Sequence, residues 1–301
     1  MASALIVRIV VCSVIDLSGS PGHTVGAAIA AHPHIAKIAF TGSTLTGRKI
    51  QEASAKSNLK VVSLELGGKA CGSPNIIFED ADFEQAVKWA SMGIFTNMGQ
   101  VCTAGSRIFV QESIYDKFIE AFRSSAQTLH GAIGDPFAKE TRHGPQVSQT
   151  QFDRVMGYIE SARTDGANIL IGGDRHGSDG YFIQPTVVTE CKPDMKLVRE
   201  EIFGPVAAVI KFKSEEEVVE MANDTTYGLA AAVFTQNNAR AVRVAHALEA
   251  GSLFVNCYNW GDQAMPFGGY KQSGVGREMG EYALETYTQV KGVHVNIGLK
   301  L

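Results

Sequence analysis

The sequence lacks the marks of several protein classes. No apolar run reaches the ~18 residues that a membrane helix needs, because the longest candidate, residues 2–17, contains Arg8 and Asp16. That segment also lacks a charged start and a small-residue cleavage pattern, so we expect no signal peptide. Positive charge is not in excess either, since 27 basic residues stand against 31 acidic ones. We therefore expect no nucleic-acid partner and no membrane partner.

Cysteine is scarce and follows no pattern. The cysteines are odd in number, far apart and without CxxC spacing: Cys12, Cys71, Cys102, Cys191 and Cys257. This arrangement predicts neither a disulfide framework nor a zinc site, and it favours a reducing, cytoplasmic compartment. The histidines are scattered as well, and His32 and His34 flank a proline instead of sharing a helix face. We therefore predict no metal site.

The apolar segments predict an α/β fold. The 301 residues are 45% hydrophobic, enough for a sizeable core. Strands expected at residues 6–17, 37–40 and 59–66 alternate with helices at 24–31 and 42–55. This β-α-β-α-β order is typical of one half of a nucleotide-binding sheet. Helices and strands continue to alternate beyond residue 74, with helices at 83–94, 118–129, 152–159 and 239–248, a capping box at Ser214 and Glu217, and strands at 107–111, 169–171, 206–212, 229–235 and 253–255.

Cys102 is a candidate nucleophile. It lies in the sequence Gly-Gln-Val-Cys-Thr-Ala-Gly, residues 99–105, between an expected helix and an expected strand. Small neighbours at such a junction leave a sulfur accessible to a ligand. A free thiol is mostly protonated at pH 7, so this role requires a lowered pKa. A buried, inert cysteine is the alternative.

Glu65 is a candidate general base. It ends the apolar segment Val61–Leu64, directly before Gly67 and Gly68. Open α/β sheets place their chemistry at the carboxyl ends of parallel strands, and burial there raises the pKa of a carboxyl group. The alternative is a glutamate that reaches solvent or pairs with Lys69.

A strand-turn-helix junction at residues 40–48 could bind phosphate through Gly42 and Ser43, because the free amides of a helix start attract anions. Its spacing also resembles a P-loop, but Arg48 and Lys49 stand where lysine and a hydroxyl residue are needed. An NTPase is therefore not predicted, while a dinucleotide pyrophosphate remains open.

Two further loops could contact ligands. Residues 200–205 contain Glu201 and Phe203 before a rigid Gly-Pro turn, so they could hold a ribose and flank a nicotinamide, or form an ordinary loop. Residues 266–274 form a glycine-rich segment whose Phe267 could line a substrate tunnel. An ordinary turn is the alternative there.

Together these motifs resemble the NAD(P)-dependent aldehyde dehydrogenases. The resemblance runs from about residue 26 to the C-terminus, and the motifs follow the family's order: residues 40–43, 64–69, 99–102, 201–205 and 266–269. It implies a partial Rossmann-like cofactor domain at residues 1–72 and a catalytic domain at residues 73–275. The remaining residues 276–301 would carry an oligomerisation strand at Gln289–Val295, which implies a homo-oligomer, either dimer or tetramer.

The resemblance also implies a reaction. An aldehyde would be oxidised to a carboxylic acid through a thiohemiacetal and a thioester on Cys102, and Glu65 would activate the water that hydrolyses the thioester. The cofactor would be NAD, with NADP also open. Gly42, Ser43, Leu66, Glu201 and Phe203 would contact it. Phe267 would lie in the substrate tunnel.

The sequence departs from the family at its front. The first strands of the cofactor sheet, and the asparagine that donates a hydrogen bond to the oxyanion, have no counterpart here. Losing one such donor typically lowers a rate by ~10²–10³. The alternatives are therefore an impaired chain that folds or oligomerises without binding NAD productively, and a cofactor-free thiol hydrolase using Cys102. A mitochondrial location also stays open.

Overall fold

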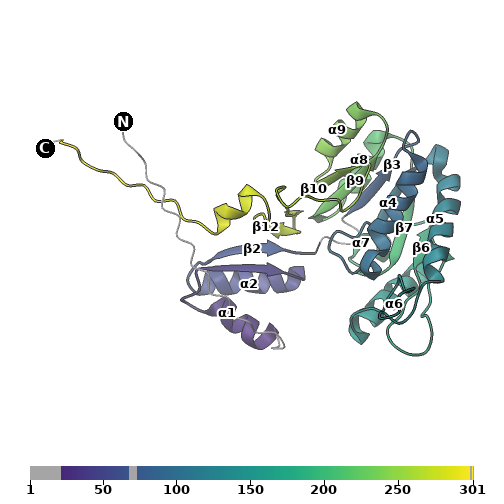
Figure 1. The fold of residues 1–301 in the computed structure, drawn as a ribbon, viewed down its shortest axis with the longest axis horizontal. Coiled ribbons are helices and arrows are strands. Elements are labelled where there is room, and N and C mark those ends of the chain that lie inside the picture. Colours follow the sequence, from purple (N-terminus) through teal and green to yellow (C-terminus); the bar gives the residue numbers. More distant parts are fainter. Residues whose placement is uncertain (1–21, 68–72, 299, 301) are drawn as a thin grey trace.

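The structure is a computed structural model that describes residues 22–67, 73–298 and 300. The strand expected at residues 6–17 lies outside these ranges. A smaller sheet with helices along one side lies next to a larger sheet packed among helices, and the C-terminal segment extends away from both (Figure 1). The α/β class predicted from the sequence is confirmed.

The smaller sheet has the order β1-β2-β12. β1 (Lys37–Thr41) and β2 (Val61–Glu65) are parallel, with Thr41 opposite Glu65. They are joined by α2 (Thr44–Lys56), which begins where the Ser43 side chain accepts a hydrogen bond from the Thr46 N–H at 3.2 Å. A short π-helical turn (Gly22–Gly26) and α1 (Ala27–Ala31) precede them. These elements agree with those expected.

The larger sheet has the order β10-β9-β3-β4-β7-β6-β5 and is parallel except for the pair β5 and β6. Its strands are β3 (Pro74–Ile77), β4 (Arg107–Gln111), β5 (Asn168–Ile171), β6 (Thr186–Thr189), β7 (Val206–Phe212), β9 (Ala230–Phe234) and β10 (Ser252–Val255). Its helices are α4 (Phe83–Phe95), α5 (Tyr115–His130), α6 (Gln149–Thr164), α7 (Lys196–Arg199), α8 (Glu215–Asn223) and α9 (Asn238–Ala247), with 3-10 turns at Thr96–Gly99 and Glu112–Ile114. A further 3-10 turn at Glu281–Thr286 lies against β2 of the smaller sheet. The predicted capping box at Ser214 and Glu217 is confirmed.

Both faces of this sheet are buried, which explains its continuous apolar strands. Successive residues of one strand enter different cores, because side chains alternate across a strand. In β3, for example, Ile76 packs with residues of α6, α8 and α9, whereas Ile77 packs with α4 and α5. Ala231 and Ala232 of β9 divide in the same way. The larger sheet is therefore the rigid support for the loops at its edges.

The prediction missed two strands of this sheet, β3 and β6. β3 begins at Pro74 and β6 begins directly after Pro185. Proline reads as a turn signal in a sequence, although the first residue of a strand tolerates it. The two-residue strands β8 (Tyr227–Gly228), β11 (Tyr270–Lys271) and β12 (Gly274–Val275) were also missed, because they are too short to show a pattern.

The segment around Ser273 connects the smaller sheet to the two-stranded sheet of β8 and β11, whose β8 directly precedes β9 of the larger sheet in the chain. Its carbonyl accepts a hydrogen bond from the Leu66 N–H at 2.8 Å, next to the antiparallel pairing of β12 with β2. Its hydroxyl donates to the Gly67 carbonyl at 3.0 Å and accepts from the Gly228 N–H at 2.9 Å. Ser273 is fully buried, so these bonds are shielded from water. The domain boundaries expected from the sequence stay a prediction, and residues 274–275 belong to the smaller sheet.

The strand expected at Gln289–Val295 does not form within this chain. Residues 289–295 have no strand assignment and are exposed, with Val290 at 98% and Val295 at 73% exposure. A strand needs a neighbour for its ladder of hydrogen bonds, and among the described residues none lies beside this segment. Strand formation on assembly with another chain stays a prediction.

Replacing Ser273 with alanine tests the connection between the sheets. Ser273→Ala leaves the Gly67 carbonyl and the Gly228 N–H without their buried partner, so we expect a loss of about 1–3 kcal/mol in the free energy of unfolding. Urea denaturation measures it. The exposed serine in Ser178→Ala serves as the control, and equal midpoints for the two variants would contradict the assignment.

Candidate active site

Cys102 lies in the connection between α4 and β4. The connection is fixed by backbone bonds, in which the Gly105 N–H donates to the Gly93 carbonyl at 3.1 Å and the Ala104 N–H to the Val101 carbonyl at 3.0 Å. The hydroxyl of the fully buried Tyr258 donates to the Thr103 carbonyl. Cys102 itself is partly exposed, as a nucleophile must be.

The electrostatics around Cys102 differ from the expectation of a lowered pKa. Burial raises the pKa of the thiol, and the charges of Glu65 and Glu201 raise it further. The backbone N–H groups of Cys102 and Thr103 act in the opposite direction. The net direction is upward, so the thiol is protonated in the resting chain at neutral pH. Because these electrostatic effects require proximity, the sulfur and both carboxylates lie in one site.

Glu65 ends β2 as a buried carboxyl group. It is only 4% exposed, and neither carboxylate oxygen has a hydrogen-bond partner among the described residues. Burial raises its pKa to about 8, the charge of Glu278 acts in the same direction, and Arg277 opposes both. The alternative of a solvent-exposed glutamate is wrong, while Lys69 lies outside the described residues. An unpartnered carboxyl group with such a pKa suits a general base that acts on water.

Arg277 and Glu278 are site residues that the sequence analysis missed. The Glu278 N–H and carbonyl each form a 2.7 Å bond with the backbone of Phe267, which is partly buried. This bridge brings the proposed tunnel residue near the residues that act on Glu65. Their signal was weak, because a charged pair after a glycine-rich segment usually reaches solvent.

The start of α2 is suited to an anion. The Gly42 N–H donates to the Glu65 carbonyl at 3.0 Å, so the turn directly adjoins the end of β2. The first turn of α2 contains no acidic residue, and helix starts offer backbone N–H groups that lack intrahelical partners. A pyrophosphate group therefore fits the charge and the donors present here.

Leu66 packs under this turn. It is 6% exposed, and a Cβ added to Gly47 would lie 2.5 Å from its Cδ2 atom. The Leu66 side chain thus contacts α2. Its role toward a cofactor stays a prediction.

The loop containing Glu201 and Phe203 lies beside the end of β2. A Cβ added to Gly67 would come within 2.8 Å of the Glu201 Oε2 atom, so the Glu201 carboxylate lies directly against the backbone of Gly67. Gln151 donates to the Phe203 carbonyl at 2.8 Å, and Arg154 donates to the Glu201 carbonyl at 2.8 Å. These bonds from α6 hold the loop in place. A carboxylate beside Gly67 could accept hydrogen bonds from ribose hydroxyls.

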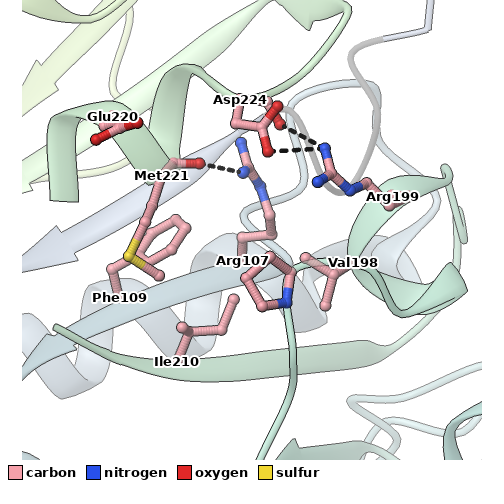
Figure 2. A pocket seen from close by; sticks show the side chains of 9 residues that line it. Arg107, Phe109, Val198, Arg199, Ile210, Glu220, Met221 and Asp224 are labelled. Atoms are coloured by element: carbon pink, nitrogen blue, oxygen red, sulfur yellow. Dashed lines mark hydrogen bonds and ion pairs between the residues drawn. The ribbon is translucent and has the colours of Figure 1, made fainter. Parts of the chain in front are cut away.

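A cavity of about 170 Å³ lies elsewhere, and none of the predicted site residues lines it. Figure 2 shows the Arg107 guanidinium directed at the carboxyl end of α8, where it donates to the Met221 carbonyl at 3.0 Å. Arg199 and Asp224 form a 2.8 Å ion pair at the rim. These polar groups serve the packing of α8, as expected for cations at a helix C-terminus.

The described part of the chain contains neither a cluster of metal ligands nor a helix that could span a membrane. Across residues 22–67, 73–298 and 300, no three histidine, cysteine or acidic side chains gather as ligands. Within the same ranges, every helix is too short or too polar to cross a bilayer.

Comparison with known proteins identifies the family. The sequence profile of the aldehyde dehydrogenase family matches residues 10–293. This chain is an aldehyde dehydrogenase family member. An aldehyde dehydrogenase of Agaricus bisporus is 57% identical over 300 residues, which cover 96% of this chain and 59% of that relative. A human relative named "Aldehyde dehydrogenase, mitochondrial" is 52% identical over 95% of this chain and 54% of its own length.

Solved structures agree with this assignment. The NAD+ complex of an aldehyde dehydrogenase from Bacillus cereus has a TM-score of 0.89 and 50% identity, covering 92% of this chain and 55% of that one. The chain thus spans less than two thirds of these aldehyde dehydrogenases. The family resemblance inferred from the sequence is confirmed.

The raised pKa of Glu65 predicts a pH-dependent stability. An unfolded glutamate titrates near 4.5 and the folded one near 8, so folding favours the protonated carboxyl group. This contribution is complete below pH 4.5 and is lost as the pH rises through about 8. Glu65→Gln should therefore exceed the parent in stability by on the order of 1–4 kcal/mol at pH 9. The difference should shrink toward pH 5.

Denaturation by urea between pH 5 and pH 9 measures this difference. The control is Glu84→Gln, which changes an exposed glutamate of α4. A constant offset between Glu65→Gln and the parent across the range would show that the folded carboxyl group is not perturbed.

Proposed function

We propose that this protein oxidises an aldehyde to a carboxylic acid with NAD, through a thiohemiacetal and a thioester on Cys102. The observation that carries the proposal is the partly exposed thiol in the electrostatic range of a buried, unpartnered carboxyl group. A nucleophile and a base with those environments are what acyl formation and hydrolysis require. Family membership supports the same chemistry.

The first step belongs to Cys102. Its minor thiolate form adds to the aldehyde carbon, and the carbonyl oxygen becomes an oxyanion beside the backbone N–H groups of Cys102 and Thr103. When bound, NAD accepts the hydride that leaves this carbon. Cys102 then carries a thioester. Only a small fraction of the thiol is ionised at neutral pH. Because this fraction grows as the pH rises, the first step should be faster at higher pH.

The second step belongs to Glu65. In its ionised form it removes a proton from a water molecule, and the resulting hydroxide attacks the thioester carbon. The carbon–sulfur bond then breaks, which gives the carboxylic acid and the Cys102 thiolate, while Glu65 holds the proton. A pKa of about 8 matches a base that must also release its proton to solvent. Neither Glu65 oxygen has a hydrogen-bond partner among the described residues, which supports the binding of that water there.

The cofactor residues follow from the charges described above. Gly42 and Ser43 would hold the pyrophosphate at the start of α2, with Leu66 lining the turn. Glu201 would bind the ribose next to the nicotinamide, and Phe203 would lie at the ring. Phe267 would line the tunnel of the small-molecule aldehyde. NADP is the alternative cofactor.

The assembly and the location of the protein are also proposals. The exposed Val290, Val293 and Val295 favour a homo-oligomer, a dimer or a tetramer, in which residues 289–295 gain a strand partner. Balanced charge and free thiols favour the cytoplasm. A mitochondrial location is the alternative, as the name of the human relative indicates for that protein.

The alternative function is a chain that folds and oligomerises without holding NAD productively. It is favoured by the outer edge of β1, which has no neighbouring strand among the described residues. An open edge next to the expected cofactor turn would weaken binding.

The reaction is tested by incubating the purified chain with an aldehyde and NAD and following NADH. Cys102→Ala should lower the rate by about a thousandfold or more, because no thioester forms. Glu65→Gln should give about one NADH per chain and then a steady rate lower by ~10²–10⁴, because hydrolysis lacks its base. In the parent, the steady rate should rise as the pH approaches 8.

Three results distinguish the functions. NADH from a folded parent chain supports the proposal, and its absence supports the alternative without productive NAD binding. Ester cleavage that depends on Cys102 and is independent of NAD would indicate a thiol hydrolase.

A further inference from the structure

The turn before Cys102 has an unfavourable backbone conformation. Asn97, Met98 and Gly99 have φ angles of 50°, 55° and 70°, all in the left-handed region. Glycine adopts this region freely, but two successive residues with side chains do so only where the surroundings hold them. Something outside the turn must therefore fix it, and Cys102 follows only three residues after Gly99.

Hydrogen bonds of Gln100 hold much of this turn in place. Its Oε1 atom accepts a hydrogen bond from the Val147 N–H at 2.8 Å, and its Nε2 atom lies 3.4 Å from the Pro145 carbonyl oxygen. The backbone N–H of Gln100 donates to the Asn97 carbonyl at 3.0 Å, and the Asn97 side chain donates back to the Gln100 carbonyl at 3.0 Å. Both ends of the one amide thus join the turn to residues 145–147.

Residues 145–147 are themselves well anchored. The Gln146 N–H donates to the Tyr181 carbonyl at 2.9 Å, and Ser148 directly afterwards caps α6. Gln146 is also buried, with its Nε2 atom 3.5 Å from the Met98 carbonyl oxygen. Gln100 therefore ties the turn to a fixed support.

The opposite side of the turn is closed by backbone. A Cβ added to Gly99 would lie 2.1 Å from the Gly204 carbonyl oxygen, so the turn touches the loop that carries Glu201 and Phe203. The turn cannot shift toward that loop. On the other side, the side-chain bonds of Gln100 to residues 145–147 and the contact of Gln146 with Met98 restrain it.

We propose that Gln100 is a positioning residue for the nucleophile: its amide holds the left-handed turn against residues 145–147 and thereby keeps the Cys102 sulfur in its partly buried place near Glu65. The inference deepens the proposed function and rests on it for the catalytic consequence. Gln100 does not touch the reacting atoms. Its effect passes through the backbone of residues 97–102.

The test is Gln100→Ala, read out by alkylation of Cys102 with iodoacetamide from pH 6 to pH 10. Burial dominates the raised pKa of this thiol, so a released turn should let its titration move down toward the ~8.5 of a free cysteine. A downward shift of about one unit makes the thiolate about tenfold more abundant at pH 7.5. Mass spectrometry of the peptide containing Cys102 is needed, because Cys191 and Cys257 are also free thiols.

The catalytic readout should move in the opposite direction. We expect Gln100→Ala to lower kcat for NADH formation about tenfold or more with a smaller change in KM, because a misplaced nucleophile is poorly oriented. A thiol that becomes more reactive toward iodoacetamide and less effective in catalysis distinguishes lost positioning from general unfolding, which would also lower the urea midpoint strongly.

Two variants complete the design. Gln127→Ala changes an exposed glutamine of α5 and should behave as the parent. Gln100→Met is uncharged and of similar length but loses both the acceptor for the Val147 N–H and the donor toward Pro145, so its titration should shift in the same direction as that of Gln100→Ala. This variant also tests whether Gln100 positions Cys102 if Gln100→Ala does not fold.

The outcomes separate this inference from the proposed function. If the titration of Cys102 is the same in the parent, Gln100→Ala and Gln100→Met, the inference is overturned. If no variant and no parent chain forms NADH, the proposed function fails, while the alkylation profiles still decide the role of Gln100.

Discussion

The burial of an unpaired carboxyl group at the end of β2 is the constraint on which the site depends. Water is the natural partner of a carboxylate, and removing it favours the neutral acid. This unfavourable free energy of burial applies to Glu65, because β12 pairs with the end of β2 and covers it. The same enclosure raises the pKa of the Cys102 thiol. Both reactive groups are thus neutral at rest, and two adjacent anions are avoided until a reaction begins.

The site is a composite of segments that are distant in the sequence. The two sheets meet there: the smaller contributes Glu65, and the larger positions the loops with Cys102 and Glu201. Each segment is held by a few hydrogen bonds from side chains to backbone carbonyls, as Ser273 and Gln151 illustrate. Because the larger sheet is packed on both faces, it is a rigid support for the loops at its edges. Precision at the site therefore comes from ordinary packing at some distance from it.

Most helices and long strands could be predicted from periodicity, and Cys102 and Glu65 from their place at the ends of elements. β3 and β6 escaped because proline at a strand start looks like a turn. The left-handed Asn97 and Met98 escaped because the contacts that support them come from other segments. The roles of Arg277 and Glu278 depend on the pairing of β12 with β2, which no local pattern records. Local signals thus pointed to Cys102 and Glu65 as candidate reactive groups, and long-range contacts determine their environment.

The pairing of β12 with β2 has a consequence for biosynthesis. Gly274 lies opposite Glu65, so one side of the smaller sheet closes only after more than two hundred further residues have been made. During translation Glu65 would remain hydrated, with the pKa of an ordinary glutamate, while the larger sheet is assembled. The raised pKa of Glu65 would then arise late, when residues 274–275 dock against β2. A chain released before that point would contain the strands of the larger sheet, while Glu65 at the end of β2 would stay open to water.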